Sequence, residues 1–279
     1  MKVAVLTSVR NDSVFMDLWL RYYGRLFGPE CLYVVLDGFD QPLPDAVPAP
    51  NLLRVPFVPA ERSVADRRRA RLISDIARGL HRLYDVVIAL DVDEFLVPDP
   101  DHYTDLSALL ARTLAERNVS SLSGLGLDVA QHTGEEGPIA LDRPILGQRR
   151  FAHVSTRYTK PAISFAPVTW GSGFHRVKRR NFYIQPHLYL FHLGMMDHAT
   201  ATARSGDSDR IAGGWTNHLR RRQKAFDIVA GTPPGDFDET TRTARRVQTL
   251  LRPPYAWNKP LMPGAPRVVR IPERFHGIV

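Results

Sequence analysis

Three carboxylates stand within four residues, directly after an apolar run. The run is Val86 to Leu90, and the acids are Asp91, Asp93 and Glu94. A continuous apolar run of this length is typical of a central parallel strand that is buried on both faces. Ligands bind at the carboxyl ends of strands in open parallel sheets, and residues i and i+2 of a strand face the same way. We therefore expect Asp91 and Asp93 to point together at the mouth of a sheet.

Neighbouring carboxylates at such a place repel each other unless something positive lies between them. A hard divalent cation, Mg²⁺ or Mn²⁺, meets this need and can bridge the oxygens of a diphosphate leaving group. The competing interpretation is that the acids cap the next turn and pair with arginines. The preceding apolar strand, the third acid and the apolar pair Phe95-Leu96 favour the metal.

Hydrophobic periodicity predicts the elements that carry these residues. The order over the first 90 residues is strand, helix, strand, strand, helix, strand, which indicates an α/β layered sheet with right-handed crossovers. The last 28 residues hold six of the 22 prolines and predict an extended tail. The expected strands are 2–7, 32–36, 53–58, 86–90, 120–127, 162–165, 182–184 and 188–192, and the expected helices are 15–26, 65–83, 216–229 and 240–251.

The charge of the chain is unevenly distributed. Residues 1–140 carry a net charge of −6 and residues 141–279 carry +14, which together give the +8 of the 279-residue chain. A basic half suggests contact with a phosphate-bearing ligand, an anionic membrane or nucleic acid. Arg-rich composition is the alternative explanation, since 32 of the 37 basic residues are arginine. The single cysteine, Cys31, excludes an intramolecular disulfide and fits a reducing, cytoplasmic location.

Residues 84–96 resemble the "yDwvl-lDvDEFL" segment of glycosyltransferase family 2-like proteins. Residues 3–12, with a following helix similar to "fl-eWl-yy--lG", also match that group. Residues 160–163 resemble its "Kpiv" element, and residues 188–193 resemble its later "l-lfHy" element. The resemblance touches residues 1–100 and 160–196 in order.

The resemblance implies a GT-A fold that forms a single domain over residues 1–279. A Rossmann-like nucleotide-sugar-binding half with a mostly parallel central sheet would occupy 1–110. An acceptor-binding half would occupy 111–200, followed by a C-terminal helical and extended segment at 201–279. The implied activity is a metal-dependent, inverting glycosyltransferase that moves a sugar from a nucleoside diphosphate sugar to a hydroxyl of a carbohydrate or another acceptor.

The resemblance also implies roles for individual residues. Asp91 would lie near the ribose and diphosphate, Asp93 would bind the metal, and His192 would be the third protein ligand. A neutral imidazole is a reasonable Mn²⁺ ligand. The alternative for His192 is a core histidine whose hydrogen bonds are satisfied within the protein.

Other polar residues could hold the nucleotide. Asp37 could accept a hydrogen bond from a uracil-type base or a ribose hydroxyl, or could serve the Asp-Gly turn. Arg68 and Arg71 share a helix face and could reach phosphates, or could form a solvated basic face. Three residues after the first strand could hold the base or ribose, or could cap the next helix: Thr7, Arg10 and Asn11.

An inverting transfer needs a base to deprotonate the acceptor hydroxyl. His175, in a glycine-containing loop, and Asp128 are candidates. Glu94 is a third, although its position favours support of the metal site or pairing with an arginine. Further carboxylates in the same half of the chain are Glu135, Glu136 and Asp197.

Two other functions compete with glycosyl transfer. A nucleic-acid-binding or nucleotidyl-transfer protein would use the basic half, but helix-turn-helix, RNP and zinc signatures are absent, so we expect no nucleic-acid partner. A catalytically inactive nucleotide-sugar-binding module would not need the intact acidic motif. The basic cluster of helix 216–229 (Arg220 to Arg222 and Lys224) could also bring the protein to the inner face of an anionic membrane.

Overall fold

The chain divides into two compact units, each assembled from several segments. The computed structural model describes residues 1–45, 48–179, 183–214 and 216–279, and describes only the backbone of residues 210 and 216–222. The first unit contains residues 1–94, 103–123 and 161–183, and the second contains 95–102, 124–160 and 184–279. This division differs from the boundaries expected at residues 110 and 200, because the units alternate along the chain.

The first unit contains the strand–helix–strand–strand–helix–strand order expected from the sequence, and the structure confirms that order. Its elements are β1 (Val3–Val9), α1 (Ser13–Phe27), the 3-10 turn η1 (Pro29–Cys31), β2 (Leu32–Asp37), β3 (Asn51–Val55), α2 (Arg62–Leu80), β4 (Val86–Ala89), α3 (Leu106–Glu116), β8 (Ile163–Ser164) and the 3-10 turn η2 (Ser172–Phe174). Strand β6 (Ser121–Ala130) begins in this unit and continues into the second.

The central sheet of the first unit is parallel. Its strands follow the order β3-β2-β1-β4, and β8 pairs antiparallel with β4. Val5 pairs with Leu32 on one side, and Val3 pairs with Val86 on the other. The expected α/β class with a parallel, Rossmann-like central sheet is therefore confirmed.

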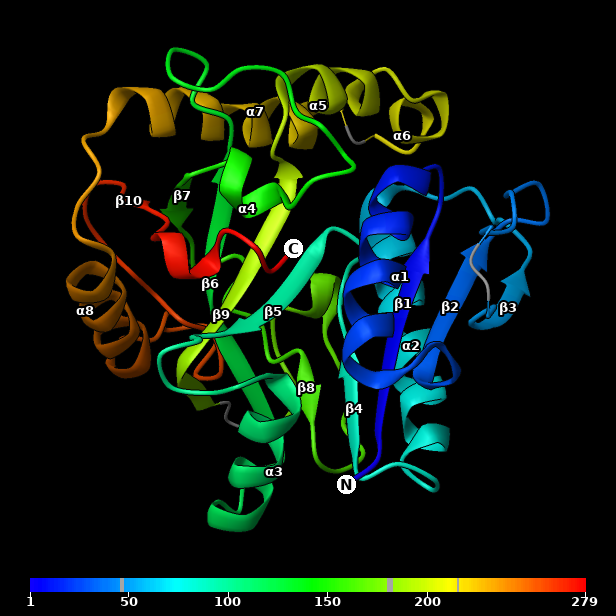
Figure 1. The fold of residues 1–279 in the computed structure, drawn as a ribbon. Coiled ribbons are helices and arrows are strands. Elements are labelled where there is room, and N and C mark those ends of the chain that lie inside the picture. The colour runs from blue at the N-terminus through cyan, green and yellow to red at the C-terminus, as the bar shows by residue number, and fades with distance from the viewer. Residues whose placement is uncertain (46–47, 180–182, 215) are drawn as a thin grey trace. The chain divides into compact units, whose positions relative to one another are not determined.

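Helices α1 and α2 cover opposite faces of this sheet (Figure 1). Side chains alternate across a strand, so Ala4 and Leu6 of β1 face α2 while their neighbours face α1. Ala77 and Ile73 of α2 complete the core on that side, and Trp170 from the segment before η2 closes it. This packing fixes the rotation of α2 and thereby decides which of its arginines lies at the sheet edge.

In the second unit, the pairs of β6 with β7 and of β7 with β10 are antiparallel. Strand β9 pairs with both β6 and β5. Its elements are β5 (Glu94–Pro98), α4 (Ile145–Gln148), β7 (Phe151–Val154), β9 (Tyr183–Met195), α5 (His198–Ser205), α6 (Ser208–Ala212), α7 (Thr216–Gly231), α8 (Phe237–Leu250), β10 (Val268–Arg270) and the 3-10 turn η3 (Glu273–Phe275).

Several expectations for this half of the chain need correction. The two strands expected at 182–184 and 188–192 form one long strand, β9, whose first described residue is Tyr183; residue 182 lies outside the described part. The tail expected to be extended contains β10 and η3. Helix α7 is present where a helix was expected, but the side chains of Arg220 to Arg222 lie outside the described part. Among the described residues, no helix is both long and apolar enough to cross a bilayer.

The close approach of backbone to Gly126 in β6 predicts that a side chain at this position would destabilise the protein. A Cβ there would lie 2.3 Å from the carbonyl carbon of Tyr158 and 2.4 Å from the backbone nitrogen of Thr159. We expect Gly126→Ala to lower the free energy of unfolding by about 1–3 kcal/mol because backbone must move. Gly79→Ala, in α2 with open space around it, should raise it by about 0.4–1 kcal/mol. Urea denaturation checks both, and a neutral Gly126→Ala would contradict the close backbone approach.

Candidate functional site

The carboxyl ends of β1, β2 and β4 meet at one edge of the parallel sheet. Thr7, near the end of β1, is 1% exposed, and its hydroxyl donates to the carbonyl oxygen of Leu90 at 3.0 Å. The hydroxyl therefore ties the end of β1 to the segment that follows β4. Its expected contact with a base or ribose stays a prediction.

Arg10 and Asn11, after β1, hold the loop that follows β2. The Arg10 guanidinium donates to the carbonyl oxygen of Asp37 at 2.7 Å and pairs with Asp40 at 3.1 Å. The Asn11 backbone nitrogen and side-chain oxygen bond the amide of Gln41, both at 2.8 Å. These contacts order the loop around the Asp37-Gly38 turn, so both residues have a structural role whether or not they bind a nucleotide.

The three acids lie in a turn and the start of the next strand, which corrects the expectation drawn from strand alternation. Strand β4 ends at Ala89 and β5 begins at Glu94, so Asp91 and Asp93 are not in a strand. The i, i+2 rule therefore does not decide where their side chains point. Asp93 is 4% exposed and Glu94 is 0% exposed, whereas Asp91 is only partly buried.

Arg69 of α2 supplies positive charge to this turn. Its Nη1 lies 2.5 Å from Oδ1 of Asp91. Burial alone would lower the pKa of the Arg69 guanidinium, but the nearby carboxylates, Asp91 first, more than offset this and raise it. Sequence reasoning selected Arg68 and Arg71 instead, and both are exposed on α2. Their contact with phosphates stays a prediction.

A spacing signal could have found Arg69. It lies four residues before Ile73, which belongs to the buried face of α2, so it borders that face at its N-terminal end. The same guanidinium acts on Asp37 as well. Burial raises the pKa of the Asp37 carboxyl, and the charges of Arg10 and Arg69 partly offset that rise. Arg69 is thus shared between the ends of β2 and β4.

His192, the expected third metal ligand, lies in the second unit on β9. It is fully buried, its Nδ1 lies 2.6 Å from Oδ1 of Asp128 on β6, and its ring stacks on Tyr158 at 3.9 Å. A carboxylate that accepts from Nδ1 fixes the tautomer with the lone pair on Nε2, as is common for metal-binding histidines. Asp91 and Asp93 belong to the first unit, so a set of three ligands stays a prediction.

The structure gives most of the candidate bases another partner. Asp128 contacts His192, and Glu94 accepts from the backbone nitrogen of Asp91 at 3.3 Å. His175 follows η2 in the first unit and is partly exposed. The other three acids bond elsewhere in the second unit: Glu135 with Arg270, Glu136 with the backbone of His132 and Arg150, and Asp197 with Arg149.

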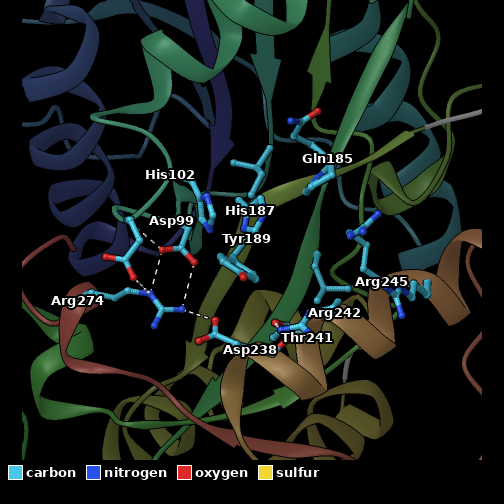
Figure 2. A pocket seen from close by; sticks show the side chains of 15 residues that line it. Asp99, His102, Gln185, His187, Tyr189, Asp238, Thr241, Arg242, Arg245 and Arg274 are labelled. Atoms are coloured by element: carbon cyan, nitrogen blue, oxygen red, sulfur yellow. Dashed lines mark hydrogen bonds and ion pairs between the residues drawn. The ribbon is translucent and has the colours of Figure 1, made fainter.

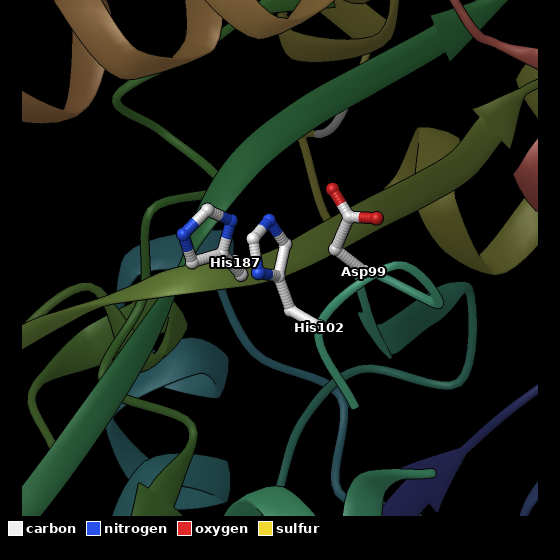
Figure 3. Close-up of side chains that lie close together, drawn as sticks. All are labelled: Asp99, His102 and His187. Carbon is white, nitrogen blue, oxygen red and sulfur yellow. The ribbon is translucent and has the colours of Figure 1, made fainter. Parts of the chain in front are cut away.

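A second group of chemically capable side chains was not expected from the sequence. Asp99, His102 and His187, all in the second unit, each present one polar atom within 4.8 Å of the others (Figure 3). Asp99 is buried and the two histidines are exposed. The spacing in the chain gives no sign of this group, because His187 is 85 residues beyond His102 and reaches it only through the pairing of β5 with β9.

Comparisons with known proteins do not place the chain in a family. No protein-family model matches it, and no curated protein matches it. Among solved structures, mannose-1-phosphate geranyltransferase from Thermus thermophilus overlaps 84% of this chain and 68% of its own, with 12% identity and a TM-score of 0.28. CMP:2-keto-3-deoxy-manno-octonic acid synthetase complexed with CTP overlaps 81% and 87%, with 12% identity and a TM-score of 0.29. Similarity this low assigns neither a family nor an activity.

Removing the charge of Arg69 should change both the free energy of unfolding and the pKa of Asp37. Arg69→Gln should lower the free energy of unfolding by about 1 kcal/mol, because the pair is partly exposed, and should raise the pKa of Asp37 further. Arg68→Gln, on the exposed side of the same helix, should change neither. Urea denaturation and an NMR titration of the Asp carboxyl carbons measure the two effects. An unchanged Asp37 pKa in Arg69→Gln would contradict the shared role of this guanidinium.

Proposed function

We propose that this protein is a metal-dependent glycosyltransferase that uses a nucleoside diphosphate sugar. One observation carries the proposal: Asp91, Asp93 and Glu94 follow β4 at the carboxyl end of a parallel sheet, beside the loops after β1 and β2. Ligands bind at this edge in open α/β sheets. The resemblance of residues 84–96 to glycosyltransferase family 2-like proteins supports the same activity.

The residues at this edge fit a divalent cation. Asp93 and Glu94 are buried carboxylates, and Arg69 contributes one positive charge against the three acids of the turn. Buried carboxylates need compensation by positive charge or hydrogen bonds, and oxygen donors suit Mg²⁺ and Mn²⁺. Asp91 and Asp93 would hold the ion. When bound, it would neutralise the developing charge of the diphosphate leaving group.

The chain's own side chains would bind and orient the donor. Arg69 already balances one carboxylate and can turn its remaining N–H groups toward phosphate oxygens, which guanidinium groups bind in pairs. Asp37, at the end of β2, would accept a hydrogen bond from the base or a ribose hydroxyl. Arg10 keeps the Asp37 turn in place through the carbonyl oxygen of that residue.

In the transfer itself, the acceptor oxygen forms a bond to the anomeric carbon while the bond from that carbon to the diphosphate oxygen breaks. The acceptor proton must pass to a base, for which we propose His175. The fully buried Glu94 bonds the backbone of Asp91 and so would shape the acidic turn. A carbohydrate or another hydroxyl compound would be the acceptor.

Metal-dependent binding of a nucleoside diphosphate tests the donor site directly. A panel of UDP, GDP, CDP and ADP, with Mn²⁺ or with EDTA, should contain one ligand that raises the melting temperature only with Mn²⁺. Asp93→Asn should abolish that rise because it removes the charge of a ligand. Asp75→Asn, an exposed acid on α2 that pairs with Arg78, should retain it. An equal rise in EDTA, or in Asp93→Asn, would show that the metal assignment is wrong.

Product analysis separates this proposal from its rivals. With the matching nucleotide sugar and Mn²⁺, glycosyl transfer or donor hydrolysis releases the nucleoside diphosphate, and Asp93→Asn should reduce the rate by at least about 100-fold. Release of pyrophosphate from a nucleoside triphosphate and a sugar phosphate would identify nucleotidyl transfer instead. Tight binding of the sugar nucleotide without turnover of any acceptor or water would identify a binding module.

A further inference from the structure

A pocket of about 400 Å³ lies wholly within the second unit. Strand β9, the segment after β5 and helix α8 form its walls (Figure 2). Its volume falls in the range of sites for small molecules. None of its lining residues belongs to the acidic turn of the first unit, so the proposed donor site does not account for it.

Charge in this pocket is separated into two sides. Asp99, Asp101 and Asp238 all gather on Arg274. Nε of Arg274 lies 2.9 Å from Asp99 and 3.5 Å from Asp101, and its Nη2 lies 2.5 Å from Asp238. Figure 2 shows this cluster on one side of the pocket, with Arg242 and Arg245 on the other. Three carboxylates against one guanidinium leave this side acidic, whereas the far side is basic.

Helix α8 presents three arginines to that far side. Arg242, Arg245 and Arg246 have i, i+3 and i, i+4 spacing, which places them on one face of the helix, and all three line the pocket. Within the described part of the chain, no hydrogen bond or ion pair joins any of them to another residue. Three guanidinium groups on one helix face repel each other, and a bound anion would relieve that repulsion.

Two histidines stand between the two sides. The rings of His102 and His187 stack with centroids 3.5 Å apart (Figure 3). The backbone carbonyl of His187 accepts from the backbone nitrogen of Asp99 at 2.8 Å. His187 in β9 has φ of +59°, an uncommon backbone conformation for a residue with a side chain. The surrounding structure therefore holds this residue in a strained conformation. Burial lowers the pKa of His187, and the charges of His102 and Arg245 lower it further against the opposing Asp99 and Asp238.

The group formed by Asp99, His102 and His187 is less suited to a metal ion than the pocket is to an anion. Both carboxylate oxygens of Asp99 already bond Arg274, at 2.9 and 3.2 Å. The planes of the two imidazole rings differ by only 31°, so lone pairs in those planes run nearly side by side and do not converge on one point. The uncompensated arginines would also repel a cation.

We propose that this pocket is a second ligand site that binds a small phosphate-bearing molecule, with Arg242 and Arg245 as the principal contacts and His102 and His187 as neighbouring donors. Guanidinium groups bind phosphate oxygens through paired hydrogen bonds, and imidazole N–H groups add to them. The site is independent of the proposed transfer reaction. A soluble phosphate ester or the headgroup of a phospholipid would supply the same chemistry.

Calorimetry with pyrophosphate, in EDTA to exclude metal-dependent binding elsewhere, tests the site. The double variant Arg242→Gln/Arg245→Gln should lose at least about tenfold in affinity, because it removes the charge-assisted hydrogen bonds to the phosphate oxygens. Arg267→Gln, which removes an arginine of the same unit that does not line the pocket, should bind as the wild type does. Absence of binding to the wild type, or an equal loss in Arg267→Gln, would overturn the proposal.

The pH dependence of sulfate binding gives a second, independent reading, since sulfate keeps both charges across the range. Protonation of His187 adds a positive charge to the pocket, and burial lowers the pKa of that imidazole, so affinity should rise as the pH falls below about 6.5. His102→Asn/His187→Asn should flatten this rise. A metal ion competes with protons for the same nitrogens, so a metal site would bind Zn²⁺ or Mn²⁺ more tightly at higher pH. That result, together with no binding of sulfate, would show that the pocket is a metal site and not an anion site.

Vesicles distinguish the two sources of the phosphate. If a lipid headgroup is the ligand, the protein should sediment with phosphatidic acid vesicles. Pyrophosphate should reverse this sedimentation, and Arg242→Gln/Arg245→Gln should abolish it. Sedimentation no greater than with phosphatidylcholine, beside calorimetric binding of pyrophosphate, would identify a soluble ligand.

Discussion

The negative charge that collects after β4 is the constraint on which the rest of the first unit depends. Asp93 and Glu94 are almost wholly buried and Asp91 adjoins them, so the turn needs positive charge nearby. Arg69 provides part of it through a 2.5 Å contact with Asp91. That contact is available only because α2 packs on the sheet with Ile73 and Ala77 inward, which brings the start of the helix to the carboxyl ends of the strands. The packing of α2 on the sheet therefore determines which positive charge reaches the acidic turn.

Much of the first unit could be predicted from the sequence, because its signals are local and strong. The apolar run at 86–90 and the 3–4 spacing of 65–83 correspond to β4 and α2 within a few residues. Helix α3 also has a local signal, because Leu106, Leu109 and Leu110 have helical spacing and Asp105 caps its first turn. The second unit was harder. Pro186 and the left-handed His187 interrupt β9 in a way that makes one strand look like two in the sequence.

The site was predictable in composition but not in geometry. The acidic segment could be found because three carboxylates after a buried strand are unusual. Their orientation could not, since the chain leaves the strand at Ala89 and the alternation of side chains ends there. Choosing Arg69 over Arg68 required knowing how α2 is rotated against the sheet. The contact of His192 with Asp128, and that of His187 with His102, depend on strand pairing between distant segments, which no local pattern encodes.

The alternation of the two units along the chain has a consequence for how the molecule could be cut or rearranged. The chain passes between the units five times, and residues 161–183 return to the first unit after the second has begun. Trp170 and Phe174 on that returning segment belong to the same hydrophobic cluster as Leu6 and Val87. A fragment that stopped at residue 110 would leave this cluster open to water, so neither unit is an autonomous module that a truncation or a gene fusion could transplant by itself.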